Sequence, residues 1–558
     1  MSITTMSLLT VAAVLSLRNL PSEAEYGYSV IFYLIMAAIC FFVPSALVSA
    51  ELASSWPEDG GVYLWVKEAF GPKWGFVAVF MQWVENLPWF PAVLTFVASS
   101  IAYVFNPAWA QNRWFVLITI WVMLWLATFL NFKGMRLSAW LSSSGALAGT
   151  LIPGAVIILM AIGYIIAGKT PQIAFSSDAL IPDLGNWNQL MLLSGMMVAL
   201  AGMEMSAIHV TEMKNPGRDF PKAIFAACIL VILLNVLGAL AIALVIPPGE
   251  ISLAAGADQA FAAMFRIFDI PWMTPIMCFL LSYGALTMVV TWVLGPSKGV
   301  LEVAKDGYLP ELWQRRNKAG MPTNILIIQA VISSLLALVI LFMPTISGAF
   351  WLMSALTAQL YMVMYLLMFA AAIKLRYSKP DIPRAYKVPG GKIGMWLVSG
   401  VAFLTSLFAI ITGFIPTPGV REKGTFYVLC YIAFLLIGTI VFIIIPLWLY
   451  KHSQKNREAA EKQDQQSICC KVYCFRQEMH LYFFAGNCTE NLSRKTGGQS
   501  CYFPVFFPMA FLFFSPAADF VSLPFSVSLS ILFSSLLREM KKICPPPLIC
   551  ILFLKQCI

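Results

Sequence analysis

Glu204 is an acidic residue inside an apolar stretch that runs from about Leu190 to Val210. An ionisable side chain at bilayer depth costs at least ~2.5–3.5 kcal/mol, so it usually faces a cavity and has a function there. Gly202 stands two residues earlier and weakens a helix where backbone groups could turn toward a ligand. The pair predicts a broken transmembrane helix around a substrate site. The alternative is a packing glycine beside a structurally paired glutamate.

Glu204 and Glu85 are the candidates for proton coupling. A carboxylate in a low-dielectric cavity is favoured in its protonated form, so it could bind and release a proton in the working pH range. Glu85 stands next to Asn86 and shortly before Pro88 and Pro91, which free backbone carbonyls that must face protein or water. This segment predicts a pocket wall that includes Asn86. A kinked helix with internally satisfied polar groups explains it equally well.

Tyr361 and Tyr365 are four residues apart and therefore share one face of a helix. Phenols in such a place can gate a pathway or donate to a carboxylate, although the spacing also suits core packing. The chain has three histidines and lacks His-Glu-x-x-His, Gly-x4-Gly-Lys-Ser/Thr and Gly-x-Ser-x-Gly motifs. We therefore expect neither an enzyme nor a nucleotide-driven pump, and no cofactor, metal or nucleic-acid partner.

The composition is that of a polytopic membrane protein in the lipid bilayer. Of the 558 residues, 60% are hydrophobic and only 11% are charged, whereas soluble chains carry ~25% charged residues. Most apolar segments are near the ~20 residues needed to cross the bilayer core. The sequence predicts an all-α fold of about twelve spans: 4–20, 28–51, 76–104, 114–131, 138–166, 188–211, 222–246, 272–295, 323–343, 348–375, 394–415 and 427–450.

The basic residues predict the orientation of these spans. Most lysines and arginines between spans follow even-numbered spans; the exceptions are Arg113, Lys169, Arg266, Arg421 and Lys423. The positive-inside rule then places the even loops and both termini in the cytoplasm. The first 21 residues lack a basic n-region and a small-residue cleavage site, so we expect no cleavable signal peptide, and the cytoplasmic segment before the first span is short or missing.

The number of spans suggests an internal symmetry. Spans 1–5 and 6–10 could form two halves, and because five is odd, the second half would enter the membrane upside down. In such inverted repeats, the first helix of each half is often discontinuous and binds substrate near the bilayer midplane. The sixth span carries the Gly202 break, and the first span offers small and polar residues from Thr10 to Ser16, before Arg18 and Asn19.

The tail differs from the rest of the chain. Most of the 12 cysteines lie after residue 465, where the composition turns to Phe, Ser, Cys and Pro without a helical period. Such a switch is typical of out-of-frame or read-through translation. We therefore predict a transporter domain at 1–465 and an atypical, aberrant or disordered tail at 466–558, to which we assign no function.

Several motifs resemble the amino acid–polyamine–organocation superfamily, and most closely its bacterial glutamate/γ-aminobutyrate antiporter subfamily. The main one is Gly202-Met203-Glu204 followed by the turn Asn215-Pro216-Gly217-Arg218-Asp219-Phe220-Pro221. Others are Pro57-Glu58-Asp59-Gly60-Gly61-Val62-Tyr63, Gly295-Pro296-Ser297-Lys298-Gly299 and Pro389-Gly390-Gly391-Lys392. The resemblance covers about residues 5–450. It implies a ten-helix inverted-repeat core with broken first and sixth helices, two extra helices, alternating access and a bacterial inner-membrane location.

The resemblance also implies site residues. Helix breaks in this family hold the amino and carboxylate groups of the substrate, as the helix dipole ends allow, and the acid of Gly-x-Glu is implicated in pH-dependent transport. Met288 stands where the antiporter subfamily has an acid, which favours a neutral or apolar substrate, and Arg18 stands where it has tyrosine. Carried over residue by residue, the resemblance places Ala12, Ala13 and Val14 near the first break and implies roles for Gly202, Tyr361 and Tyr365. We expect these residues, with Met203, Ser206, Asn86 and Met288, to contact the substrate.

The sequence thus predicts a secondary active amino-acid transporter, and an antiporter with pH-sensitive or proton-linked transport in particular. Its partners would be a small amino acid, protons and the lipid bilayer. The alternatives are a proton-coupled amino-acid symporter and a membrane amino-acid sensor that does not transport. The sequence does not indicate which amino acid is carried or whether the chain forms oligomers.

Overall fold

The computed structural model of the chain describes residues 2–56, 60–173, 180, 195–197, 199–204, 213–416 and 418–456. The chain divides into two compact units, Met1–Ser453 and Gln454–Ile558. The helices treated below belong to the first unit, and the last of them runs on to Asn456. The predicted tail at 466–558 lies outside the described residues.

Within the described residues, ten continuous helical segments are long and apolar enough to cross a membrane, and no strand occurs. They correspond to ten of the twelve predicted spans, and the two that remain are the predicted broken spans, 4–20 and 188–211. The ten are Gly27–Ser55, Pro72–Phe105, Arg113–Phe132, Trp140–Ile166, Arg218–Val245, Met273–Lys305, Thr323–Phe342, Ile346–Ser378, Gly391–Thr412 and Thr425–Asn456. The protein is therefore an all-α polytopic membrane protein.

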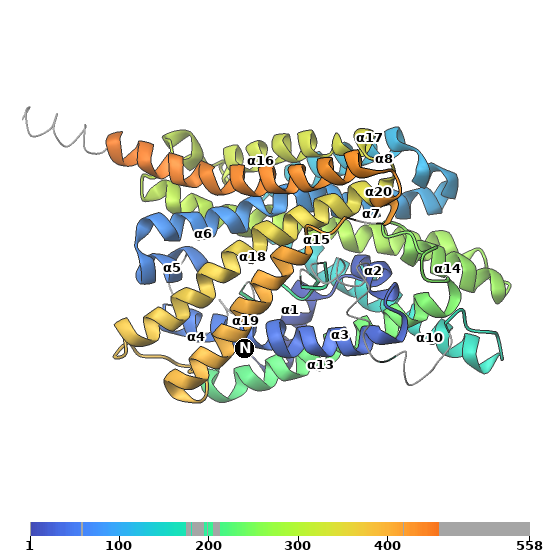
Figure 1. Cartoon of the computed structure of the whole chain (residues 1–558), viewed down its shortest axis with the longest axis horizontal. Helices are drawn as coiled ribbons and strands as arrows, with labels where there is room; N and C mark the ends of the chain where they lie inside the picture. Colours follow the sequence, from blue (N-terminus) through green and yellow to red (C-terminus); the bar gives the residue numbers. More distant parts are fainter. Residues whose placement is uncertain are drawn as a thin grey trace, which may run out of the picture. The chain divides into compact units, whose positions relative to one another are not determined.

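The long helices run side by side in the first unit (Figure 1). Some spans are single helices. Two other spans each contain a π-helical turn between two α-helices, at Ala38–Phe42 and at Ala146–Leu151. The helices of the first half are α1 (Ile3–Val14), α2 (Leu20–Ala24), α3 (Val30–Ala37), α4 (Val43–Ser55), α5 (Val62–Phe70), α6 (Pro72–Val84), α7 (Asn86–Phe105), α8 (Arg113–Phe132), α9 (Met135–Gly145) and α10 (Ile152–Ile166). Those that follow are α13 (Pro216–Val245), α14 (Gly256–Ile267), α15 (Met273–Lys305), α16 (Thr323–Leu336), α17 (Val339–Phe342), α18 (Ile346–Ser378), α19 (Gly391–Thr412) and α20 (Pro418–Arg421).

The two halves repeat the same order of elements. A short helix follows the second span of each half: α5 in the first half and α14 in the second. The packing repeats as well, because the fifth span packs on the seventh (α10 on α13) and the tenth packs on the second (α18 on α4). The third spans of the two halves, Pro72–Phe105 and Met273–Lys305, are among the longest spans. They pack against each other through α7 and α15. Such repetition is what an inverted-repeat core requires.

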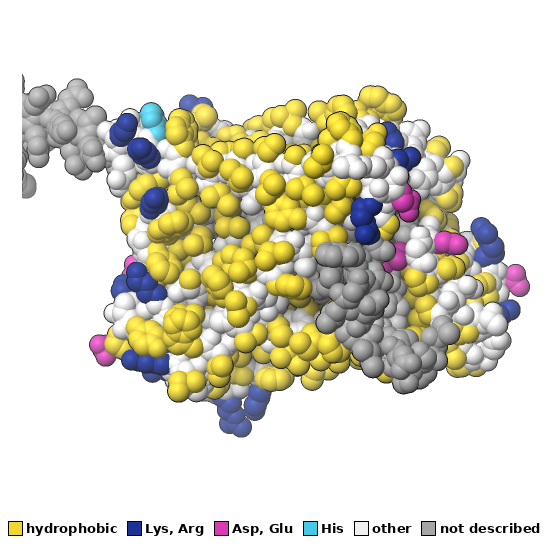
Figure 2. Space-filling view, viewed as in Figure 1, with side chains coloured by type: hydrophobic (Ala, Val, Ile, Leu, Met, Phe, Trp, Pro, Cys, Tyr) yellow, Lys and Arg dark blue, Asp and Glu magenta, His cyan; other side chains and the backbone are white. Residues whose placement is uncertain are grey.

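The outer face is apolar. Figure 2 shows hydrophobic side chains over most of the visible surface, with Lys and Arg side chains toward its edges. Large aliphatic side chains stay exposed on the outer helices, for example Leu397 on α19 at 63% and Ile444 on the last helix at 54%. Exposed apolar area of this extent is unfavourable in water and is suited to lipid.

Two helices cross in close contact at a pair of glycines. A Cβ added to Gly149, in the π-helical turn of the fifth span, would lie 2.2 Å from the Cα of Gly284 on α15. A Cβ on Gly284 would in turn lie 2.6 Å from the Gly149 backbone. Small residues allow the backbones of transmembrane helices to approach in this way.

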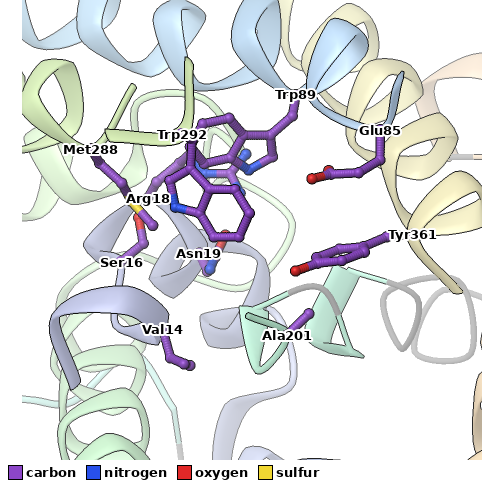
Figure 3. A pocket seen from close by; sticks show the side chains of 10 residues that line it. All are labelled: Val14, Ser16, Arg18, Asn19, Glu85, Trp89, Ala201, Met288, Trp292 and Tyr361. Carbon is purple, nitrogen blue, oxygen red and sulfur yellow. The ribbon is translucent and has the colours of Figure 1, made fainter. Parts of the chain in front are cut away.

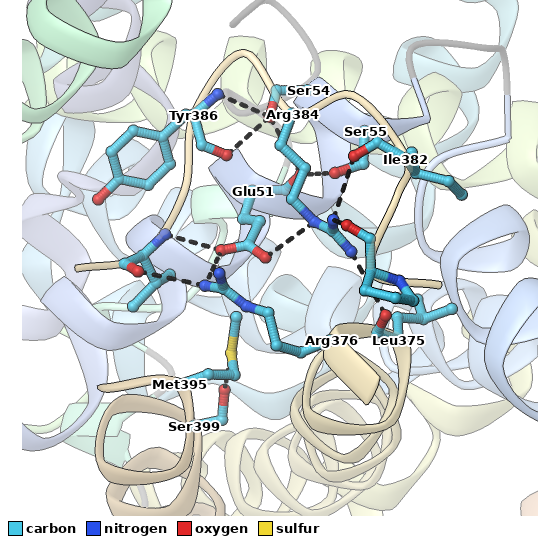
Figure 4. Close-up of polar contacts among 12 residues, drawn as sticks. Glu51, Ser54, Ser55, Leu375, Arg376, Ile382, Arg384, Tyr386, Met395 and Ser399 are labelled. Atoms are coloured by element: carbon cyan, nitrogen blue, oxygen red, sulfur yellow. Dashed lines mark hydrogen bonds and ion pairs between the residues drawn. The ribbon is translucent and has the colours of Figure 1, made fainter. Parts of the chain in front are cut away.

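A buried cluster of charges fastens the loop between α18 and α19 onto α4 (Figure 4). Glu51 of α4 accepts from Arg376 Nη2 at 2.6 Å and from the backbone N–H of Val388 at 2.7 Å. Arg384 Nε lies 3.2 Å from the other carboxylate oxygen. Ser54 and Tyr386 extend the cluster, because the Ser54 hydroxyl bonds both backbone groups of Tyr386. The second span is thereby tied to the end of the tenth.

Candidate functional site

The first span is broken between α1 and α2. Leu15 and Ser16 are extended, with φ/ψ of −70°/123° and −140°/119°, and a 3-10 turn at Leu17–Asn19 leads into α2. The break falls one to four residues after Ala12, Ala13 and Val14, the residues that were expected near it. Of these three, Val14 lines the cavity described below; the side chains of Ala12 and Ala13 lie outside the described part of the chain.

The sixth span is interrupted at the predicted glycine. Ala201 and Gly202 are non-helical, and Gly202 has φ +112°, a conformation that side chains with a Cβ rarely adopt. Met203 and Glu204 are helical again. The freed N–H of Gly202 donates to the hydroxyl of Tyr365 on α18 at 2.9 Å. Ser206 lies outside the described residues.

The two breaks meet at a cavity of about 20 Å³. α7, α15 and α18 complete its wall, and Figure 3 shows Arg18, Met288 and Trp292 on one side, and Glu85 and Tyr361 on the other. A volume of this size holds about one water molecule, so an amino acid can enter only if the lining side chains move. The lining residues are Val14, Ser16, Arg18, Asn19, Glu85, Trp89, Ala201, Met288, Trp292 and Tyr361.

Glu204 lies behind the cavity wall. Its carboxylate is 1% exposed and accepts hydrogen bonds from the hydroxyls of Tyr361 and Tyr365 and from Gln82 Nε2 at 3.2 Å. Of these three donors, only Tyr361 is also among the residues that line the cavity. The phenol of Tyr361 therefore stands between the carboxylate and any ligand in the cavity, and Tyr365 links the carboxylate to the Gly202 backbone.

Glu85 lies in the cavity wall, at the joint between α6 and α7. Its carboxylate accepts from Asn86 Nδ2 at 2.6 Å, and its backbone carbonyl accepts from Thr357 of α18 at 3.3 Å. Asn86 itself does not line the cavity; its amide bonds Glu85 and the Gln82 carbonyl, at 2.9 Å. Of the predicted contacts, Val14, Met288 and Tyr361 line the cavity, whereas Gly202, Met203 and Tyr365 are not among the lining residues.

The prediction overlooked several residues of the cavity wall. Arg18 is an ionisable residue inside a predicted span, so the criterion that singled out Glu204 would have found it. Trp292 follows Met288 by four residues and so shares its face of α15. For Ser16, Asn19 and Ala201, the sequence offered no signal beyond their nearness to a break. Nothing in the sequence indicated that Trp89 lines the cavity.

The part of the chain that the structure describes holds no group of three or more His, Cys, Asp or Glu residues that could bind a metal ion. The cavity instead combines one guanidinium, one carboxylate, hydroxyls and indole rings. These groups can bind and orient a small charged molecule. They do not form a nucleophile with an adjacent base.

The chain matches known transporters over most of its length. The family model for amino acid permeases matches residues 1–464. An uncharacterized transporter of Legionella pneumophila is 43% identical over 80% of this chain and 96% of its own length. A glutamate/γ-aminobutyrate antiporter of Lactococcus lactis is 30% identical over 81% of this chain and 91% of its own. A probable agmatine/putrescine antiporter of the same species is 22% identical over 76% and 88%.

Proposed function

The chain belongs to the amino acid permease family, and on that premise we propose that this multi-pass membrane protein exchanges amino acids by alternating access. It is an amino-acid transporter and not an enzyme. Antiport is supported by two relatives whose names describe antiporters, of glutamate and γ-aminobutyrate and of agmatine and putrescine. The chain covers 91% and 88% of their lengths, so these relatives align nearly in full.

One observation carries the proposal: two helix breaks meet at a cavity that contains a cation and a carboxylate on opposite sides. Arg18 lies on one side and Glu85 on the other (Figure 3). An amino acid carries both anionic and cationic groups, and a cavity with charges of both signs can bind and orient it. The C-terminal end of α1 adds partial negative charge on the side of the first-span break.

The cavity volume supports alternating access over a channel. A space of about 20 Å³ is too small for an amino acid in the present conformation. Binding must be coupled to movement of the lining helices, and a carrier requires such coupling. A channel would need a continuous path through the same region.

Proton linkage is part of the proposal and rests on Glu204. Its buried carboxylate is held by two phenols, and one of them, Tyr361, faces the cavity. Protonation of one Glu204 oxygen would weaken the acceptor of the tyrosine bonded to it, which is Tyr361 at the cavity or Tyr365 at the Gly202 break. The same relay suits a proton-coupled symporter, which is the second candidate function.

We place the protein in a bacterial inner membrane with both termini in the cytoplasm, as the positive-inside rule predicts. The Glu51 cluster would then face the cytoplasm.

Purified protein in proteoliposomes tests the proposal. Vesicles loaded with one unlabelled amino acid at a time are assayed for uptake of a labelled panel at pH 5.5 and 7.5. We expect uptake that requires internal amino acid and that differs between the two pH values. Uptake into empty vesicles driven by a proton gradient would instead support the symporter. Binding without any flux would contradict transport and support a sensor.

A further inference from the structure

Arg18 is a buried cation without a hydrogen-bonded partner. Its side chain is 5% exposed and lines the cavity. The guanidinium lies 5.7 Å from the centroid of the Trp89 ring and 5.8 Å from that of Phe350. Its Nε is buried without an acceptor, and within the part of the chain that the structure describes Arg18 forms no hydrogen bond or ion pair.

A buried guanidinium normally has a hydrogen-bonded anion beside it, because the desolvation of an unpaired charge is strongly unfavourable. Contacts with aromatic faces offset part of this cost. Glu85 lines the same cavity, but its carboxylate is bonded to Asn86 and not to Arg18. The geometry therefore leaves the fork of Arg18 donors available to an anionic group that enters the cavity.

The first-span break already offers donors for the α-carboxylate of an amino acid. No hydrogen bond from the backbone N–H of Ser16 or Leu17 occurs within the described residues. Ser16 lines the cavity, so the N–H groups of this extended break can donate to a carboxylate that enters it. Because the break can hold the α-carboxylate, Arg18 is available for a second acidic group.

The side of the cavity that contains Arg18 suits a short alkyl chain. Met288 and Trp292 of α15 lie there with Arg18 (Figure 3). Met288 alone favoured a neutral substrate, but Arg18 on the same side of the cavity supplies a cation that suits an anionic group. The opposite side carries Glu85, which suits the ammonium group.

We propose that Arg18 is a specificity-determining residue that binds a side-chain carboxylate, so that the preferred substrate is an acidic amino acid. The inference rests on the proposed function and names the substrate class of the same site. A guanidinium binds a carboxylate through two parallel hydrogen bonds, whereas a side-chain amide of the same shape leaves one donor opposed by an N–H group.

The test is equilibrium binding of L-glutamate and of its near-isostere L-glutamine to the purified full-length chain. We compare the wild type with Arg18→Gln and Arg18→Lys. In Arg18→Gln, glutamate binding weakens by at least ~30-fold and glutamine binding changes by less than ~3-fold. Arg18→Lys keeps the charge but loses the fork, so it gives an intermediate loss. Arg113→Gln is the matched control, because Arg113 bonds the carbonyls of Leu341 and Pro344 away from the cavity.

Equal loss of both ligands in Arg18→Gln, or a wild type that does not prefer glutamate, overturns the inference. If Arg18→Gln does not fold, as judged by its thermal melting, the wild-type preference and Arg18→Lys decide. The proposed function fails separately. Arg18-dependent glutamate binding without exchange in proteoliposomes contradicts transport but upholds the inference. Exchange of neutral amino acids without a preference for glutamate would support transport but overturn the inference about Arg18.

Discussion

The hydroxyl of Tyr365 accepts a hydrogen bond from the backbone N–H of Gly202 at 2.9 Å. The same hydroxyl donates to Glu204, two residues further along the chain. One phenol on α18 therefore satisfies the backbone of the sixth-span break and holds the buried acid beside it. We therefore expect a change in the charge of Glu204 to reach the break through this contact.

Tyr365→Phe removes both bonds at once. The Gly202 N–H and one oxygen of Glu204 lose their partners, at about 1–3 kcal/mol for each buried polar group left unsatisfied. We expect transport to fall by roughly 5- to 150-fold, measured as initial exchange rate in proteoliposomes. Tyr431→Phe is the control, since its hydroxyl bonds the Gly413 carbonyl and is a partner of neither Gly202 nor Glu204. Equal rates in Tyr365→Phe and the wild type would refute the role of this contact.

Glu204→Gln tests the proton linkage. The amide keeps the shape of the carboxylate but cannot titrate between about pH 5 and pH 8. We expect wild-type exchange to change across this range and the variant to give a flat profile at whatever rate it retains. A variant with the wild-type pH profile would remove Glu204 from the coupling mechanism. Glu85→Gln, measured in parallel, shows whether the second carboxylate accounts for any dependence that is left.

Gly284→Ala tests the close crossing of α15 and the fifth span. The new Cβ would lie 2.6 Å from the Gly149 backbone, and overpacking of this kind costs ~1–3 kcal/mol. We expect a lower melting temperature in detergent. Gly400→Ala on α19 is the matched control, since nothing lies within 4 Å of its added Cβ. Equal melting temperatures for the two variants would show that the helices do not approach this closely.

Glu51→Gln tests the charge cluster at the end of α4. Removing the carboxylate charge leaves Arg376 and Arg384 buried beside a neutral amide, and breaking a buried ion pair costs about 3–5 kcal/mol. We expect a marked loss of thermal stability. Glu302→Gln breaks the more exposed pair with Lys305, for which ~0.5 kcal/mol or less is expected. A similar small effect in both variants would contradict the buried cluster.

Much of the fold could be predicted from the sequence because apolar length and charge are local properties. Ten predicted spans coincide with helical segments of the structure. The Gly202 break was also predictable, since a glycine next to a buried acid is a local signal. The first break was placed less accurately. Ala12, Ala13 and Val14 are compatible with helix, and the chain stays helical through Val14 before it becomes extended at Leu15 and Ser16.

The site was predicted less completely, because membership of a cavity depends on how helices rotate against one another. Glu204 and Glu85 share the same local signal, but only Glu85 lines the cavity, whereas Glu204 lies behind Tyr361. Tyr361 and Tyr365 share a helix face and both bond Glu204, yet only the first reaches the cavity. The unpartnered state of Arg18 follows from its surroundings in three dimensions and could not be predicted from its position in the chain.

The central claim is that the substrate binds in the cavity where the two helix breaks meet. A counterflow assay with a variant that fills this cavity tests the claim most directly. Ala201 lines the cavity at the sixth-span break, and Ala201→Leu adds a larger side chain to a space of about 20 Å³. Labelled amino acid is offered to proteoliposomes loaded with the same unlabelled compound. We predict exchange by the wild type only when internal amino acid is present, and none by an Ala201→Leu protein that keeps the wild-type melting temperature. Undiminished exchange by Ala201→Leu would show that the substrate binds elsewhere.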